Sequence, residues 1–243
     1  MKNEFRSIRW SYLFNPSEKE IREWKRIIKE VTESCRITYF PKEDGSGEYP
    51  YVITPSESRW PYKYMQAVKQ GLRYMLAEEL READAVLLIE AKGYPLTCVV
   101  DGLPLDIIFA RKRDYKIQDQ IKIHQRKAYK TNGNNELFIV CSDYRDNGLR
   151  GDEKLLILET IISSGETVCS TIKELRNSTD CEILGVGAIY ERGDGIEHIK
   201  EEVNVDAKGF ARLEVIEENG IVKPHIPYFW DERERYLKEL KKK

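Results

Sequence analysis

A short, unbroken apolar run recurs along this chain, and it constrains the fold more than any other feature. The runs are AVLLIE at 85–90, LDIIFA at 105–110, ELFIVC at 136–141, KLLILE at 154–159 and EILGVGAIY at 182–190, with FARLEVI at 210–216 after them. Such runs fit the strands of a parallel sheet buried on both faces. Helical patterns lie between them, notably Val168, Ile172 and Leu175 after Gly165. This alternation predicts the α/β class, with a doubly wound and mostly parallel sheet.

The N-terminal part of the chain has a different pattern. Ser17 and Glu20 form a capping box, and apolar residues from Ile21 to Val31 follow at helical spacing. A stretch rich in Pro and Gly from 41 to 55 predicts a loop with at most short extended pieces. A second helical pattern runs from Trp60 to Leu80 and leads into the first apolar run. We therefore expect an N-terminal appendage over 1–59, a core over 60–223 and a C-terminal helical tail over 224–243, with a small hood built from either terminus or both.

Charge and composition exclude several classes of protein. The 243 residues include 40 Lys+Arg and 42 Asp+Glu, so the net charge is −2, and any bound anion must be held by a local site rather than by bulk charge. We expect no nucleic-acid partner and, because no apolar run approaches the roughly 18 residues of a membrane span, no membrane partner. The start MKNEFRSIRW lacks the apolar segment of a secretory signal, so we expect a cytoplasmic protein. Five cysteines without a CxxC pair and three histidines without ligand spacing predict no disulfide framework and no metal site.

The most informative segment is LLILETIISSGET at 155–167. Ligands of parallel sheets bind where strands end, and here an apolar strand ends in Glu159 and a hydroxyl-rich loop before a helix. A helix N-terminus with Ser163, Ser164 and Thr167 beside it offers the donors that cradle a phosphate. Glu159 could accept hydrogen bonds from two sugar hydroxyls, so the pair indicates a sugar phosphate. On spacing alone, an ordinary strand–loop–helix connection explains the segment equally well.

The same segment resembles the phosphoribosyl-pyrophosphate (PRPP) motif of type I phosphoribosyltransferases, in which four apolar residues precede two acids and a T-G-x-T-like loop. Two further segments match in order. EAKGYPLT at 90–97 resembles the E-A-R-G-F-P-L pyrophosphate loop, and FARKRDY at 109–115 resembles the R-K-R-P-Y segment of purine phosphoribosyltransferases, especially the archaeal hypoxanthine and adenine type. IYERGDG at 189–195 and the LEVIEENGIVK ending extend the similarity over residues 60 to 223.

The resemblance implies an activity: transfer of a phosphoribosyl group from PRPP to a purine-like base, with release of pyrophosphate and with Mg²⁺ as cofactor. It implies PRPP or a nucleoside 5′-monophosphate as ligand, and a homodimer. It also implies roles for individual residues. These are ribose binding by Glu159 and Thr160, a 5′-phosphate loop of Ser163, Ser164, Gly165, Glu166 and Thr167, a pyrophosphate loop of Ala91, Lys92 and Gly93, and a catalytic cationic clamp of Arg111, Lys112 and Arg113 together with Lys92. The polar stretch from Lys116 to Asn135 corresponds to a hairpin that closes over the site.

The chain also departs from the family pattern. Thr160 replaces the second acid, Glu166 stands where Gly is common, and Ser163 stands where several 6-oxopurine enzymes have an acid. The PRPP motif is therefore degenerate, which leaves open a second function: a non-catalytic nucleotide- or PRPP-sensing regulator or scaffold. For the acceptor base, aromatic residues near both termini are candidates, and we name Phe229 and Trp230 as stacking residues, with packing anchors as the alternative.

Overall fold

The computed structural model describes residues 15–41, 46–55, 59–89, 94–112, 114, 120–124, 136–141 and 148–240. Its helices are α2 (Glu18–Glu33), α3 (Tyr62–Met75), α4 (Ala77–Glu82), α5 (Thr97–Val100), α6 (Glu166–Ser178), α7 (Gly195–Val203) and α8 (Arg233–Leu240), with short 3₁₀ turns at Tyr94–Leu96 and Trp230–Glu232. Its strands are β1 (Ile37–Pro41), β2 (Glu48–Val52), β3 (Ala85–Ile89), β4 (Asp106–Arg111), β5 (Gln120–His124), β6 (Glu136–Val140), β7 (Lys154–Ile162), β8 (Glu182–Glu191), β9 (Ala207–Arg212), β10 (Glu214–Glu218) and β11 (Ile221–His225). Among these helices, none is long and apolar enough to span a bilayer.

The central sheet has the strand order β5-β6-β4-β3-β7-β8-β9. The pairs β4–β3, β3–β7, β7–β8 and β8–β9 are parallel, whereas β6 pairs antiparallel with β4 and with β5. Leu88 of β3 pairs with both Phe109 of β4 and Leu158 of β7. The carboxyl ends of the parallel strands therefore meet at one side of the sheet, which we call the carboxyl edge.

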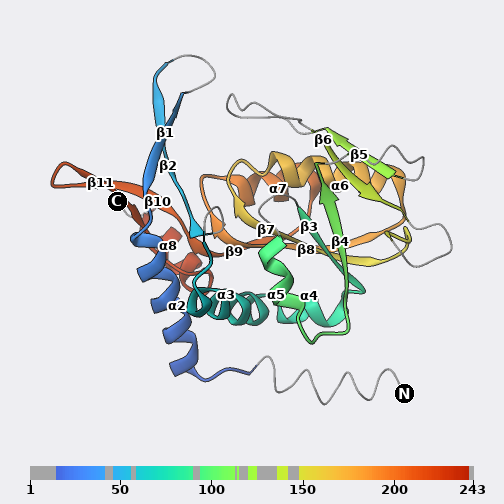
Figure 1. Cartoon of the computed structure of the whole chain (residues 1–243), viewed down its shortest axis with the longest axis horizontal. Helices are drawn as coiled ribbons and strands as arrows, with labels where there is room; N and C mark the ends of the chain where they lie inside the picture. The colour runs from blue at the N-terminus through green and yellow to red at the C-terminus, as the bar shows by residue number, and fades with distance from the viewer. Residues whose placement is uncertain are drawn as a thin grey trace.

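Helices cover both faces of this sheet (Figure 1). Successive strand side chains point to opposite faces, so Leu156 and Leu158 of β7 join a buried cluster with α3, α4 and α5, while Leu155 and Ile157 join a second cluster with α6 and α7. The prediction of a doubly wound, mostly parallel α/β fold is confirmed.

Helix α2 begins at the predicted capping box: the Ser17 N–H donates to Glu20 Oε2 at 2.8 Å, and the Glu20 N–H donates to Ser17 Oγ at 3.3 Å. A buried chain of hydroxyls joins this helix to the core. The Thr32 hydroxyl donates to the Ile28 carbonyl at 2.6 Å, so Tyr190 must donate to Thr32 (2.5 Å) and Tyr64 to Tyr190 (2.8 Å). Burial raises the pKa of both phenols above the ordinary value, which keeps them protonated.

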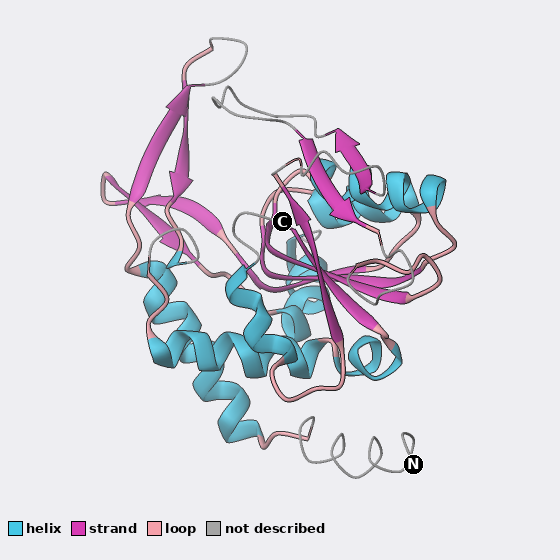
Figure 2. Cartoon of the chain, turned by 45° about the vertical axis from the view of Figure 1, so that its right-hand side comes forward, coloured by secondary structure: helices cyan, strands magenta, loops and turns pink. Residues whose placement is uncertain are grey.

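Two hairpins stand beside the end of the sheet that β9 forms (Figure 2). β2 lies within the Pro- and Gly-rich stretch and pairs antiparallel with β1, which ends at Pro41, and β10–β11 contacts this pair. The expected single strand at 210–216 is wrong: β9 ends at Arg212, and the chain then leaves the sheet to form β10. β10 then turns back at Asn219-Gly220, where φ values of 53° and 75° close a two-residue hairpin between Glu218 and Ile221.

The hydroxyl chain predicts unequal costs for two similar substitutions. Tyr190→Phe removes the acceptor of Tyr64 and the donor to Thr32, so we expect it to lower the free energy of unfolding by about 1–3 kcal/mol. Tyr64→Phe removes only the first donor of the chain, and we expect a loss of about 0.5–1.5 kcal/mol. Urea denaturation of both variants and of the double variant measures these values. A Tyr190→Phe protein as stable as the wild type would contradict the contribution of the hydroxyl chain to stability.

Candidate functional site

The carboxyl edge brings together segments that lie far apart in the sequence. Ala110 of β4 pairs with Ile89 of β3, and Ile162 of β7 pairs with Glu191 of β8. Arg111 and the segment 159–167 therefore lie at the same edge, as predicted. Residues 90–93 and Arg113 lie outside the described residues, so the expected roles of Ala91, Lys92, Gly93 and Arg113 stay predictions.

The loop Ser163–Ser164–Gly165 connects β7 to the N-terminus of α6. Ser163 and Ser164 are exposed, and Gly165 has a φ of 77° at the N-cap, with no side-chain cap. The first N–H groups of an α-helix have no partner within the helix and form the positive end of its dipole. Exposed hydroxyls beside these donors make a site for a phosphate or another compact anion.

The loop packs against Gly195, the first residue of α7. A Cβ atom at Gly195 would overlap the Ser163 carbonyl oxygen and would lie 2.8 Å from Ile162 Cγ2. Real Cβ contacts are not this short, so only glycine allows the two backbones to approach here. The position of the loop 163–165, the predicted phosphate loop, therefore depends on Gly195.

Glu166, at the first position of α6, does not have an isolated charge. Its Oε1 lies 3.4 Å from His198 Nε2 on α7, and both side chains are 35% exposed. The carboxylate therefore lies beside the neighbouring helix, and a protonated His198 would offset part of the repulsion that a phosphate at this N-terminus meets.

Thr160 is hydrogen-bonded to the carboxylate of Glu159. Glu159 Oε1 accepts hydrogen bonds from the Thr160 N–H at 2.7 Å and from the Thr160 hydroxyl at 3.2 Å. Thr160 is fully buried, whereas Glu159 is half-buried. In this arrangement Thr160 supports the carboxylate from the protein side. The ribose-binding role expected of Thr160 itself stays a prediction.

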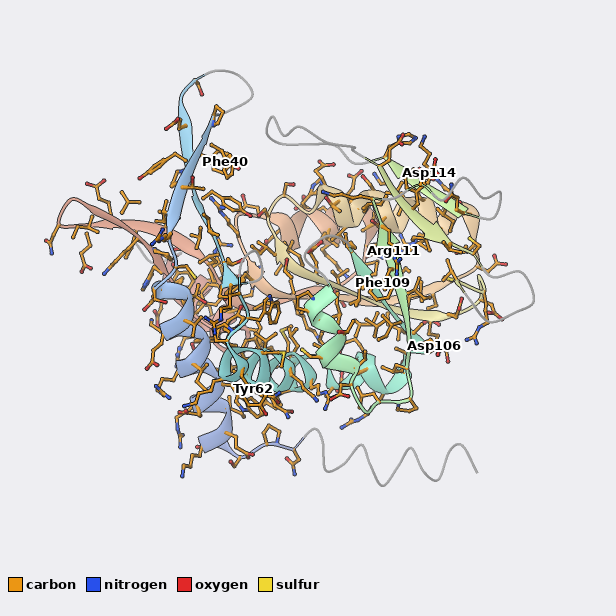
Figure 3. All side chains as sticks on the ribbon, in the orientation of Figure 1. Phe40, Tyr62, Asp106, Phe109, Arg111 and Asp114 are labelled. Carbon is orange, nitrogen blue, oxygen red and sulfur yellow. The ribbon has the colours of Figure 1, made fainter. Side chains whose placement is uncertain are left out.

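Arg111 and Lys112 of the predicted cationic clamp end β4. The Arg111 guanidinium carbon lies 4.9 Å from the centroid of the Phe109 ring, two residues earlier on the same strand face (Figure 3). Lys112 is exposed. The stacking on Phe109 fixes one cation at the carboxyl edge, where it can face a diphosphate.

The residues at the end of β8 have no role predicted from the sequence. Glu191 is 2% exposed, and the Tyr228 hydroxyl donates to its Oε1. Its Oε2 lies 3.5 Å from Arg233 Nε. Burial raises the pKa of the Glu191 carboxyl, against the hydrogen bond from Tyr228 and the guanidinium charges. The signal that could have revealed Glu191 and its neighbour Arg192 is the charged pair directly after an apolar run.

Phe229 is buried in the core, and Trp230 is partly buried against it. Phe229 is 7% exposed, its ring centroid lies 5.6 Å from that of Phe210, and Lys25 Nζ lies 5.3 Å from the same Phe229 ring. Trp230 packs against Tyr74 at 5.9 Å. These contacts leave the Phe229 ring little surface for a base, and they give both residues the packing role that was the alternative.

We expect Gly195→Ala to displace the Ser163 carbonyl and to weaken binding of inorganic phosphate and ribose 5-phosphate about tenfold or more, because the donors of a preformed cup lose their alignment. Titration calorimetry measures both affinities. Gly220→Ala is the control: it strains a positive φ in the β10–β11 turn, where nothing lies within 4 Å of the added atom. Equal loss of phosphate affinity in the two variants would show that Gly195 does not act locally.

Thr160→Val removes one of the two donors to Glu159. We expect affinity for ribose 5-phosphate to fall about three- to tenfold, in line with one hydrogen bond to a charged group, while affinity for inorganic phosphate stays at the wild-type value. Thr160→Ser, which keeps the hydroxyl, should retain most of the affinity. A Val variant that binds both ligands normally would remove the supporting role of Thr160.

No family model matches the chain. The hypoxanthine/guanine phosphoribosyltransferase of Methanothermococcus okinawensis is 28% identical over 198 residues, which cover 81% of this chain and 97% of that relative. Adenine phosphoribosyltransferase from Saccharomyces cerevisiae, solved with adenine and an altritol bisphosphate, superposes with a TM-score of 0.57 at 14% identity, covering 77% of this chain and 98% of that one. The enzyme from Trypanosoma brucei, solved with AMP, pyrophosphate and ribose 5-phosphate, gives 0.54 at 12% identity and 80% of each chain. The chain is thus a homologue of archaeal purine phosphoribosyltransferases and has the type I phosphoribosyltransferase fold.

Proposed function

We propose that this chain transfers the phosphoribosyl group of PRPP to a ring nitrogen of a purine-like base and releases pyrophosphate. The observation that carries the proposal is the shared carboxyl edge: a carboxylate, an anion-binding helix N-terminus and a stacked arginine lie at the ends of neighbouring strands. Archaeal relatives that match over nearly their whole length and are named as purine phosphoribosyltransferases support the same activity.

In the proposed reaction, the bond between C1 of the ribose and the pyrophosphate oxygen breaks, and its electron pair leaves with the pyrophosphate. A lone pair on the base nitrogen forms the new bond to C1, and the base releases its N–H proton to solvent water. Positive charge develops on the ribose and negative charge on the diphosphate. The protein therefore needs to hold the ribose in place and stabilise the diphosphate, and it needs no nucleophile of its own. Glu159 would hold the ribose hydroxyls, the loop 163–167 the 5′-phosphate, and Arg111, Lys112, Arg113 and Lys92 the departing diphosphate.

Mg²⁺ belongs to this proposal as the ion that accompanies PRPP. Magnesium keeps several waters and is usually bound through one or two carboxylates together with substrate phosphates. The described residues contain no cluster of three or more His, Cys, Asp or Glu side chains that could hold a metal. A single carboxylate at Glu159 beside a diphosphate fits the magnesium pattern, in which the ion neutralises part of the leaving-group charge.

The proposal extends to the hood and to the assembly. β1–β2 and β10–β11 contact each other, so we propose a hood that combines both hairpins, with the core ending near Leu213 rather than at residue 223. We also propose that the protein is a cytoplasmic homodimer. Sedimentation velocity measures its oligomeric state. The names of the relatives do not favour the sensor or scaffold as the alternative function.

Lys92→Ala tests the reaction. We expect pyrophosphate release with PRPP and a purine base to fall about 10²- to 10³-fold, the scale for loss of one group that stabilises developing charge, with little change in melting temperature. Lys154→Ala is the matched control, because Lys154 begins β7 at the opposite edge of the sheet. Equal activity losses in the two variants would contradict the assignment, as would a Lys92→Ala loss explained by unfolding.

A further inference from the structure

Arg192 joins two parts of the molecule that are far apart in the sequence. Its backbone N–H donates to the Ile162 carbonyl at 2.8 Å, directly before the phosphate loop. Its guanidinium donates to the Pro50 carbonyl of β2 at 2.7 Å. One residue therefore fixes the distance between the phosphate loop and the β1–β2 hairpin.

The same guanidinium lies against the aromatic face of that hairpin. Its central carbon is 5.8 Å from the Tyr49 ring centroid and 5.6 Å from the Tyr51 ring centroid. Phe40 pairs across the hairpin with Tyr49, and its ring meets the Tyr51 ring edge-on at 5.3 Å. These three partly exposed rings, Phe40, Tyr49 and Tyr51, form what we call the hairpin aromatic face.

The chemistry of arginine suits this junction. A guanidinium is planar, stacks on aromatic rings and donates hydrogen bonds in fixed directions, whereas a lysine ammonium supplies only a charge on a flexible stem. The contacts to two rings and a carbonyl thus set the orientation of the hairpin as well as its proximity. The pair β10–β11 also contacts the hairpin, so a second element supports its orientation.

A planar base needs an aromatic surface near the bound sugar phosphate. Phe229 and Trp230 already pack against other aromatic rings, whereas the hairpin aromatic face is partly exposed. Arg192 ties this face to Ile162, the residue directly before the phosphate loop. We infer that Arg192 is a positioning residue that holds the hairpin aromatic face beside the phosphate loop, and that this face determines which acceptor base is used. The inference rests on the proposed transferase function.

The test compares Arg192→Ala, Arg192→Lys and Tyr51→Leu with Arg36→Ala, which removes a positive charge from an exposed position at the foot of the same hairpin. We expect Arg192→Ala and Tyr51→Leu to raise KM for the base about tenfold or more, the scale of a lost stacking contact. KM for PRPP should change less than about twofold, since the phosphate cup is made by the backbone of another segment. Arg192→Lys should lie between, and Arg36→Ala should match the wild type.

Hydrogen exchange without substrate provides a readout that does not depend on the reaction. In Arg192→Ala the amides of 48–52 should exchange faster, with those of β7 unchanged. Unchanged exchange in β2, or equal rises of both KM values, would overturn the inference. If the wild-type protein transfers no phosphoribosyl group to any base, the proposed function fails. Faster amide exchange of 48–52 in Arg192→Ala would then still show that Arg192 holds the hairpin, but the inferred role of the hairpin in base selection would be wrong.

Discussion

Parallel pairing of β7 with β8 along nearly their whole length is the constraint on which the other features depend. The pairing places the end of β7, with Glu159 and the phosphate loop, next to the end of β8. Backbone hydrogen bonds in a buried ladder are costly to break, so the relative position of these two strand ends is rigid. Every segment that anchors to the end of β8 is thereby placed against the phosphate loop.

Three consecutive residues at that end anchor three segments. Tyr190 holds α2 through the buried hydroxyl chain, Glu191 holds the C-terminal segment through Tyr228 and Arg233, and Arg192 holds the β1–β2 hairpin. Neighbouring strand side chains point to opposite faces, so adjacent positions can reach segments on different sides of the sheet. Helix α2, the C-terminal segment and the β1–β2 hairpin are therefore tied to the carboxyl edge by the three residues Tyr190, Glu191 and Arg192.

The apolar runs and the capping box at Ser17 were sufficient to predict the sheet, its mostly parallel character and α2, because each of these depends on local sequence. The common edge of Arg111 and Glu159 followed from strand direction alone. The end of β8 could not be predicted in this way: the partners of Glu191 and Arg192 are Tyr228 and Pro50, far away in the chain, and only the packed fold brings them together. The Asn219-Gly220 turn was readable, since Asn-Gly between β-forming residues is a strong hairpin signal.

The substitutions in the PRPP motif have a common physical basis. In the proposed phosphate site, a cup built from backbone N–H groups depends on where the backbone lies rather than on side-chain identity. It would therefore accept Ser163 in place of an acid, and Glu166, whose Oε1 lies 3.4 Å from His198 Nε2, in place of a glycine. At position 160 a second acid beside Glu159 would have to be buried, and a buried charge without a partner is costly. A threonine hydroxyl avoids this cost and still donates to Glu159. Under the proposed function, the chain would thus hold the ribose through one carboxylate in a defined orientation, and its phosphate binding would depend on Gly195 more than on any side chain of the loop.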